Sequence, residues 1–368
     1  MSTALLLFFG RGGDSEIEHR LDAIKIAIGA SVLRRARDAG FAPLVAVTED
    51  DQAGRIFARA GAEVAAPRTA PFHFGREVAD ITKTRHLERV ATIGAGAGAL
   101  FTVDELAKLR EELEQSEALV LSNNYYSADL VAFTPTSALG VIDLPATDNP
   151  LPRRLHLQGG LSSRQLDRSA ATLFDVDTPA DAAVLKRHPK CPDDLRSLDA
   201  WEPELGPRID ALMQLVTTPE KELLVAGRVG APVWSYLETQ TASRVRMLAE
   251  ERGMQAAGRD VSGEARTALG FLYQEIGPER FFARMGELGD GMLLDSRVLF
   301  AHLRLRASAP DRFSSDIFRA SAIEEEPLAV FTAAAAAAPY PLLLGGQTLV
   351  SGVLWTLVEA AWAGHPEE

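Results

Sequence analysis

Cysteine is almost absent from this sequence, since Cys191 is the only one among 368 residues. A single cysteine excludes an internal disulfide, and it also excludes a zinc site built from several thiolates. The seven histidines show no ligand spacing such as His-x-x-x-His, so we expect no zinc or di-iron site. These absences fit a cytoplasmic protein whose fold depends on its hydrophobic core.

Unbroken hydrophobic runs and a signal sequence are also missing. The longest apolar run near the C-terminus, residues 330–344, contains two prolines and is too broken to span a bilayer. Residues 1–10 are largely apolar but lack the basic region that opens a signal peptide. We therefore expect no transmembrane helix and no membrane partner, and residues 1–10 are typical of a first buried strand.

Positive charge is scarce. Lysine and arginine number 38 against 51 acidic residues, which leaves a net charge of −13. General nucleic-acid binding needs a basic patch that releases counterions from phosphates, so we expect no nucleic-acid partner. Arginine outnumbers lysine 32 to 6. Because guanidinium groups suit bidentate contacts with phosphate or carboxylate, a local basic pocket is still compatible with the composition.

Residues 1–190 alternate short apolar runs with helical patterns. This rhythm is typical of βαβ units, and it predicts an α/β fold with a mostly parallel sheet and helices on both faces. Thr102 and Glu105 form a capping box that starts one helix. We expect strands at residues 4–9, 43–48, 63–66, 89–93, 119–122, 130–134 and 172–176, and helices at residues 22–39, 53–60, 77–88 and 103–113.

The composition changes after this region. A linker rich in proline and charge, residues 191–207, leads to long helical patterns with hardly any strand-like alternation. We expect residues 208–368 to form an all-α domain of unknown role, which either covers the site of the first domain or forms a homodimer. Its expected helices are residues 208–216, 234–252, 263–275, 279–288, 295–305, 327–338 and 348–362.

The strongest chemical signal follows residue 173. Asp175 and Asp177 lie two positions apart in an apolar run that predicts a strand, so both side chains would point to one face. Thr178 can cap a helix that Pro179 opens. Carboxylate oxygens are the ligands that Mg²⁺ and Mn²⁺ prefer, so the pair is a candidate metal site. The alternative interpretation is a helix cap after an ordinary buried strand.

The same stretch resembles a known superfamily. The sequence Phe-Asp-Val-Asp-Thr-Pro-Ala-Asp-Ala at residues 174–182 is similar to the signature of the MobA-like and 2-phospholactate guanylyltransferase (CofC-like) nucleotidyltransferases. The segment Glu-His-Arg-Leu at residues 18–21 is similar to their Lys-Ser-Arg-Leu element. The resemblance covers the N-terminal half and implies a GT-A type fold. It also implies that Asp175 and Asp177 bind the metal and act in catalysis, and that Arg20 stabilises the pyrophosphate leaving group.

A glycine-rich loop follows the first predicted strand. It contains Gly10, Arg11, Gly12 and Gly13. Glycine lets backbone N–H groups approach phosphate, and an arginine adds a charge-assisted contact. In the resembled superfamily this loop holds the nucleotide base and phosphates. The alternative is a plain turn from strand to helix.

A second loop of glycine and alanine spans residues 94–99. It matches the dinucleotide pattern G-x-G-x-x-G/A, but the following helix starts several residues later and the next predicted strand ends in amides, which argues against NAD. Such small side chains let a ligand or another backbone approach closely. Alignment with the resembled superfamily places Ala97 at a metal-binding aspartate, so Ala97 should lie opposite Asp175 and Asp177 and this loop supplies no carboxylate.

Asn123 and Asn124 follow another predicted strand. Their amides suit a nucleotide base or ribose, although asparagine also makes turns. The resemblance implies a nucleotidyltransferase-like protein that uses Mg²⁺ or Mn²⁺ to transfer a nucleotidyl group from an NTP to a small phosphorylated or carboxylated acceptor. Two alternatives remain open. One is a glycosyltransferase that uses an NDP-sugar, and the other is a non-catalytic nucleotide-binding or scaffold protein.

Overall fold

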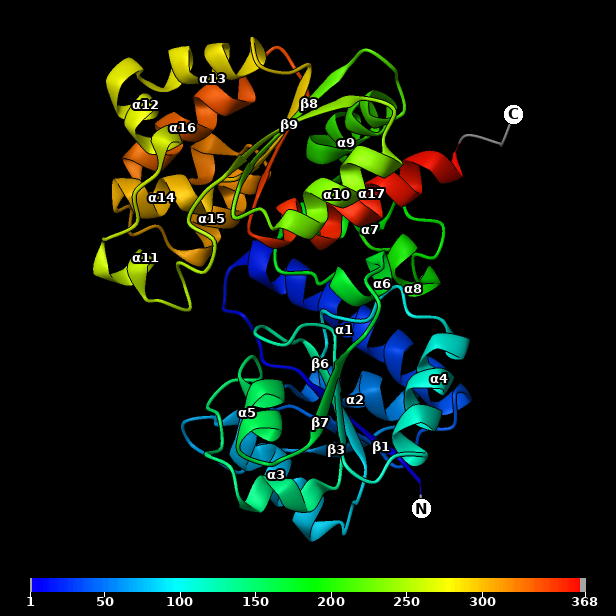
Figure 1. Cartoon of the computed structure of the whole chain (residues 1–368). Helices are drawn as coiled ribbons and strands as arrows, with labels where there is room; N and C mark the ends of the chain where they lie inside the picture. The colour runs from blue at the N-terminus through cyan, green and yellow to red at the C-terminus, as the bar shows by residue number, and fades with distance from the viewer. Residues whose placement is uncertain (1, 365–368) are drawn as a thin grey trace. The chain divides into compact units, whose positions relative to one another are not determined.

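The computed structural model describes residues 2–364, which form two compact units (Figure 1). The first unit contains the chain up to residue 12, residues 22–175 and residues 192–195, and the second contains residues 13–21, 176–191 and the chain from residue 196. The chain therefore passes between the units five times. The expected domains, residues 1–190 and 208–368, are each a continuous segment, whereas each of these units combines three segments of the chain.

A seven-stranded sheet forms the centre of the first unit. Its strand order is β3-β2-β1-β4-β6-β5-β7, and among the described strands only β6 runs antiparallel to its neighbours. The α/β fold with a mostly parallel sheet is therefore confirmed. The strands are β1 (Ala4–Phe8), β2 (Leu44–Val47), β3 (Glu63–Ala65), β4 (Val90–Gly94), β5 (Leu119–Ser122), β6 (Leu130–Thr134) and β7 (Ser162–Gln165).

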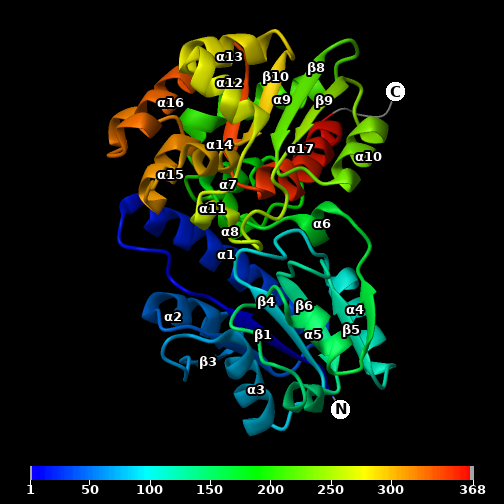
Figure 2. The ribbon, with the colours of Figure 1, turned by 60° about the vertical axis from the view of Figure 1, so that its left-hand side comes forward.

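Helices cover both faces of this sheet, as the sequence predicted (Figures 1 and 2). Alternate strand residues face opposite sides. Leu6 and Val45 share a buried cluster with α3 and α5, whereas Leu7 lies beside Gly29 of α1. The helices of this part of the chain are α1 (Glu16–Asp38), α2 (Asp51–Arg59), α3 (Phe74–Thr84), α4 (Val103–Glu114), η1 (Thr136–Gly140), α5 (Leu151–Leu157) and α6 (Ala170–Leu173).

Residues 172–176 do not form the strand that the sequence predicted. The short helix α6 ends at Leu173, and beyond it only an isolated antiparallel bridge joins Asp175 to Ala97. The last strand of the sheet is β7, which the sequence analysis missed. Its residues Ser-Ser-Arg-Gln are polar and mostly exposed, so the edge strand carries no hydrophobic signal.

The second unit has a parallel sheet of its own (Figure 2). Four strands lie in the order β11-β10-β8-β9, and all three pairings are parallel. The prediction of helices alone in residues 208–368 is therefore wrong, although most of the expected helices are present. The strands are β8 (Glu222–Gly227), β9 (Arg244–Ala249), β10 (Gly291–Asp295) and β11 (Leu342–Gly345).

Helices cover this second sheet on both sides. Figure 1 shows α9, α10 and α17 on one side of it and α12, α13, α14 and α16 on the other. The helices from residue 179 onward are α7 (Pro179–Leu185), α8 (Asp193–Arg196), α9 (Glu202–Val216), α10 (Ala231–Gln240), α11 (Arg259–Ser262), α12 (Ala268–Ile276), α13 (Pro278–Gly286), α14 (Arg297–Leu303), α15 (Ala309–Asp316), η2 (Ala320–Ala322), α16 (Glu326–Ala336), η3 (Thr348–Val350) and α17 (Gly352–Ala363).

The segment expected as a linker, residues 191–207, contains part of a core. Trp201 is completely buried and directly precedes α9. The proline-rich and charged composition therefore belongs here to a connecting segment with a buried side chain. Within residues 2–364, no helix combines the length and the apolar character needed to cross a bilayer.

Candidate functional site

The carboxyl edge of the first sheet contains a point where the strand order reverses. The chain builds β1, β2 and β3 outward in one direction and then places β4 on the other side of β1. Phe8 and Gly94, the last residues of β1 and β4, are paired in register, and the amide of Ala95 donates to the carbonyl of Phe8 (2.9 Å). Such a reversal is where open α/β sheets place ligands. Both glycine-rich loops begin here.

The loop after β1 already holds a carboxylate. The backbone amide of Gly12 donates to both oxygens of Asp22, at 3.3 and 3.1 Å. Gly10 and Arg11 are exposed, and no atom lies within 4 Å of the position that a Cβ on Gly10 would take. Gly13 belongs to the second unit. A phosphate bound at Gly12 would therefore have to displace Asp22 or share the amide with it.

The loop after β4 is closely packed. Residues 95–100 are all buried, and Gly98 has a φ of +75° in which an added Cβ would lie 2.7 Å from Ile93. Ala97 forms the isolated bridge with Asp175. The small side chains of this loop thus admit another backbone, one of the two roles that the sequence suggested. The backbone of Ala97 pairs directly with that of Asp175, and the predicted role of Ala97 opposite a metal-binding pair of carboxylates stays a prediction.

The acidic segment alternates between buried and exposed residues. Phe174 and Val176 are buried, Asp175 is half-buried and Asp177 is exposed. Asp175 ends a segment of the first unit, and Asp177 belongs to the second. Within the part of the chain that the structure describes, no group of three or more histidine, cysteine, aspartate or glutamate residues could hold a metal ion. Metal binding at Asp175 and Asp177 stays a prediction.

Asp181 is a buried carboxyl group in the same motif, and the sequence analysis gave it no role. Its Oδ2 atom accepts hydrogen bonds from the amides of Asp177 (3.0 Å) and Thr178 (2.7 Å) and from the hydroxyl of Thr348 (2.9 Å). Its Oδ1 atom is buried and has no hydrogen-bond partner among residues 2–364. Burial and, to a smaller extent, the charge of Asp177 raise the pKa of Asp181 to about 7. The Thr-x-x-Asp spacing at the start of α7 was the signal for this contact.

We expect the free energy of unfolding of the Asp181→Asn variant to fall less, or to rise more, with increasing pH than that of the parent. In the folded protein Asp181 keeps its proton up to a pH of about 7, whereas the unfolded chain releases it near 3.8. The unfolded state then binds fewer protons, so this group makes the free energy of unfolding fall as pH rises from about 4 to about 7. Urea unfolding across this pH range measures the slope. Glu117→Gln, at an exposed position, should keep the parent slope.

Arg20, expected to contact pyrophosphate, is engaged within the second unit. Its Nη2 atom lies 2.5 Å from Oδ2 of Asp199, and its guanidinium carbon lies 4.8 Å from the centre of the Trp201 ring. The side chain is a quarter exposed. The contact with Asp199 uses one nitrogen of the guanidinium group, and the catalytic role of Arg20 stays a prediction.

The two asparagines form the turn between β5 and β6. Asn123 donates to the carboxylate of Asp129 (3.0 Å), and its Oδ1 accepts from the amides of Asp129 and Leu130. Oδ1 of Asn124 accepts from the amide of Tyr126 (3.0 Å). These contacts are the turn-forming role that the sequence left open, and nucleotide binding by these amides stays a prediction.

The carboxyl edge of the second sheet contains buried ion pairs that the sequence analysis missed. Arg228 binds Asp295 through Nε–Oδ2 (2.5 Å) and Nη2–Oδ1 (3.0 Å), and both side chains are almost fully buried. Arg297 binds the completely buried Asp316 in the same bidentate way. Gly227, with a φ of +126°, leaves no room for a Cβ, which would lie 2.4 Å from Cβ of Asp295. An acid after a buried apolar run was the available signal.

Comparison with known proteins finds similarity to solved structures only. No protein-family model and no curated protein sequence matches the chain. A protein from Desulfovibrio desulfuricans described as a nucleotide-diphospho-sugar transferase is 18% identical, with 58% of this chain and 98% of that chain covered and a TM-score of 0.40. A cytidylyltransferase from Leptospira borgpetersenii is 14% identical, with 51% of this chain and 86% of that chain covered and a TM-score of 0.40. CMP:2-keto-3-deoxy-manno-octonic acid synthetase, solved with CTP, is 14% identical, with 49% of this chain and 95% of that chain covered and a TM-score of 0.36. At these TM-scores no activity is carried over from these proteins.

Proposed function

We propose that the first unit binds a nucleotide at the carboxyl edge of its sheet, and that the protein transfers a nucleotidyl group from a nucleoside triphosphate to a small phosphorylated or carboxylated acceptor. The observation that supports this most is the bridge between Ala97 and Asp175. It places a half-buried carboxylate beside the loop that follows β4, where the strand order reverses. Ligands of doubly wound sheets bind at such a point.

Different residues at this edge would bind different parts of a metal-bound triphosphate. The exposed Gly10 and Arg11 offer a backbone amide and a guanidinium group to phosphate oxygens. Asp175 offers a carboxylate to Mg²⁺, which is commonly bound by one or two carboxylates together with substrate phosphates. One carboxylate, that of Asp175, is therefore enough for this type of site if the phosphates supply further ligands. Mg²⁺ bound there would neutralise charge on the phosphates.

Ligand-dependent stabilisation tests the proposal. We expect an NTP to raise the unfolding temperature of the full chain, and to do so more strongly with Mg²⁺ or Mn²⁺ than with EDTA. Asp175→Asn should weaken the metal-dependent binding roughly tenfold or more, which corresponds to about 1.4 kcal/mol, while binding in EDTA persists. Asp104→Asn, an exposed acid on α4, is the matched control. Stabilisation by NDP-sugars alone would instead favour a glycosyltransferase.

Ala97→Asp is expected to strengthen metal binding. Ala97 is 4% exposed and faces Asp175, so the new carboxylate would add a ligand oxygen to the same site. Without metal, two facing carboxylates repel each other, and the variant should unfold at a lower temperature than the parent. With Mn²⁺ the difference should shrink or reverse. Calorimetric titration with Mn²⁺ checks this, and an unchanged affinity would show that the metal binds elsewhere.

The absence of a carboxylate at Ala97 also favours a second candidate function. A protein with this site could bind a nucleotide without transferring the nucleotidyl group, because the residue that pairs with Asp175 in the loop after β4 is an alanine. Release of pyrophosphate from an NTP in the presence of candidate acceptors separates the two functions. Nucleotide binding without any pyrophosphate release, for phosphorylated and carboxylated acceptors alike, would identify a binding protein.

A further inference from the structure

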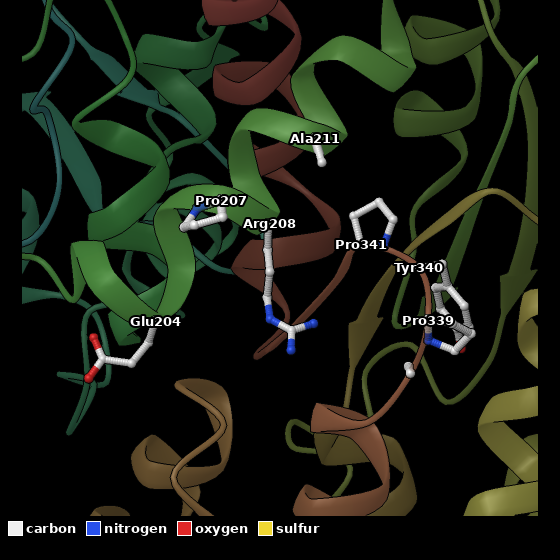
Figure 3. Close-up of a pocket in the computed structure, with 8 residues that line it drawn as sticks. Glu204, Pro207, Arg208, Ala211, Pro339, Tyr340 and Pro341 are labelled. Carbon is white, nitrogen blue, oxygen red and sulfur yellow. The ribbon is translucent and has the colours of Figure 1, made fainter.

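The second unit contains a shallow cavity, wide open to solvent, of about 470 Å³ at the amino end of β11 (Figure 3). One wall is a side of α9, and the other is the chain segment that leads into β11. This is the opposite end of β11 from the ion pairs at the carboxyl edge. The cavity is lined by Glu204, Pro207, Arg208, Ala211, Ala338, Pro339, Tyr340 and Pro341.

Among the described residues, Arg208 is the only cation that lines the cavity. Its guanidinium carbon lies 3.9 Å from the centre of the Phe318 ring, so that ring covers one face of the group. Nη2 donates to the carbonyl of Ala336 (3.1 Å), at the end of α16. A guanidinium group has five N–H donors, and within residues 2–364 this is the one hydrogen bond of the side chain. Figure 3 shows the group extending into the open space between the two walls.

No acid in the cavity neutralises this charge. Glu204 is the only acidic lining residue, and its Oε1 atom accepts from Nε of Arg319 (2.9 Å). In Figure 3 its carboxylate points away from Arg208. Burial lowers the pKa of Arg208. The cavity therefore presents one positive charge with free donors.

The rest of the lining is apolar and rigid. It consists of prolines, alanines and the ring of Tyr340, whose hydroxyl donates to the carbonyl of Phe282 (2.9 Å). Proline and a hydrogen-bonded tyrosine lose little conformational freedom when a ligand binds, which favours affinity. A volume of this size lies in the range of small-molecule sites.

We propose that this cavity binds a small organic monocarboxylate. The carboxylate would accept two hydrogen bonds from the free edge of Arg208, and the apolar body would lie against the prolines and Tyr340. A phosphate monoester fits less well, because it carries about −1.5 to −2 charges at pH 7 and the cavity supplies one cation. The carbonyl end of α16, which carries partial negative charge, also lies at Arg208 and disfavours a second negative charge.

Titration of the full chain with 3-phenylpropionate, its amide and phenyl phosphate tests the proposal, in EDTA and without nucleotide. We expect the carboxylate to bind at least about tenfold more tightly than the amide, because a charge-assisted pair is lost with the amide. Phenyl phosphate should bind more weakly than the carboxylate. Arg208→Gln should abolish the preference for carboxylate over amide, and Arg280→Gln, an exposed arginine on α13, should keep it.

A second variant guards against an effect on folding. Ala211→Leu retains Arg208 and a good helix former on α9 but fills part of the cavity, so it should weaken binding of the carboxylate and the amide alike. Equal binding of carboxylate and amide to the parent, tighter binding of phenyl phosphate, or an unchanged preference in Arg208→Gln would each overturn the proposal. The outcome is independent of the proposed nucleotide site, because neither metal nor nucleotide is present and every lining residue belongs to the second unit.

Discussion

A fragment that ends at residue 190 is expected to aggregate. It contains α7, in which every residue from Pro179 to Leu185 is buried. In the full chain α7 packs against α9, α17 and β11, and all three lie beyond residue 190. The fragment would expose this largely apolar helix to water, which makes association favourable. Size-exclusion chromatography with light scattering measures the result.

A shorter fragment, residues 1–175, is the control and should behave better. It lacks α7 and keeps all seven strands of the first sheet together with the helices on both faces. We expect it to be more nearly monodisperse than residues 1–190 and to unfold cooperatively. If the longer fragment is instead a well-behaved monomer, burial of α7 does not depend on α9, α17 and β11.

Asp295→Ala should cost about 3–5 kcal/mol of stability, because it leaves the charge of Arg228 buried without a partner. Asp295 is completely buried, and Arg228 is 3% exposed. The carboxylate also accepts from the amides of Arg228 and Arg297, so its loss frees several donors at once. Urea unfolding of the full chain at pH 7 measures the difference.

Two further variants separate the burial of the charge from the loss of a contact. Glu287→Ala breaks an exposed pair with Arg284, in which both side chains are more than 60% exposed, and should cost no more than about 1 kcal/mol. The double variant Arg228→Met with Asp295→Leu removes both buried charges and should lose less stability than Asp295→Ala alone. Equal losses in the single and double variants would mean that the buried charge is not the cause.

The sequence predicted the first sheet better than the second for a physical reason. In residues 1–134 the strands other than β3 are mostly buried apolar runs, and most of them are separated by helices with caps or glycine stops, so these signals agree with one another. In the second unit β10 and β11 are runs of four or five residues rich in leucine, which periodicity cannot distinguish from buried helix. Flanking glycine and proline residues were the only indication that these runs were strands.

β9 was mistaken for the end of a long helix. Its sequence Arg-Val-Arg-Met-Leu-Ala alternates charged and apolar residues at the start, and its burial alternates in the same way. That pattern is typical of an edge strand. The preceding helix α10 supplied a helical period that extended through it. Thr241, extended in the structure, marks the true end of the helix.

The sequence could predict which segments lie close together at the candidate site, but not the contacts that their side chains make. Sequence alignment placed Ala97 opposite Asp175, and in the structure these two residues form an isolated bridge. It could not reveal that Gly12 binds Asp22 or that Arg20 binds Asp199, since these partners depend on contacts across 10 and 179 residues. Local patterns carry little information about such pairings.

The five passages between units also bear on how the chain is made. Residues 13–21 leave the ribosome early, but the partners of Arg20 in its own unit, Asp199 and Trp201, follow about 180 residues later. At a synthesis rate of roughly 5–20 residues per second, this segment waits roughly 9–36 s for them. The start of the first helix therefore remains without these partners until about half of the chain has been made, which makes it a natural site for chaperone binding on the nascent chain.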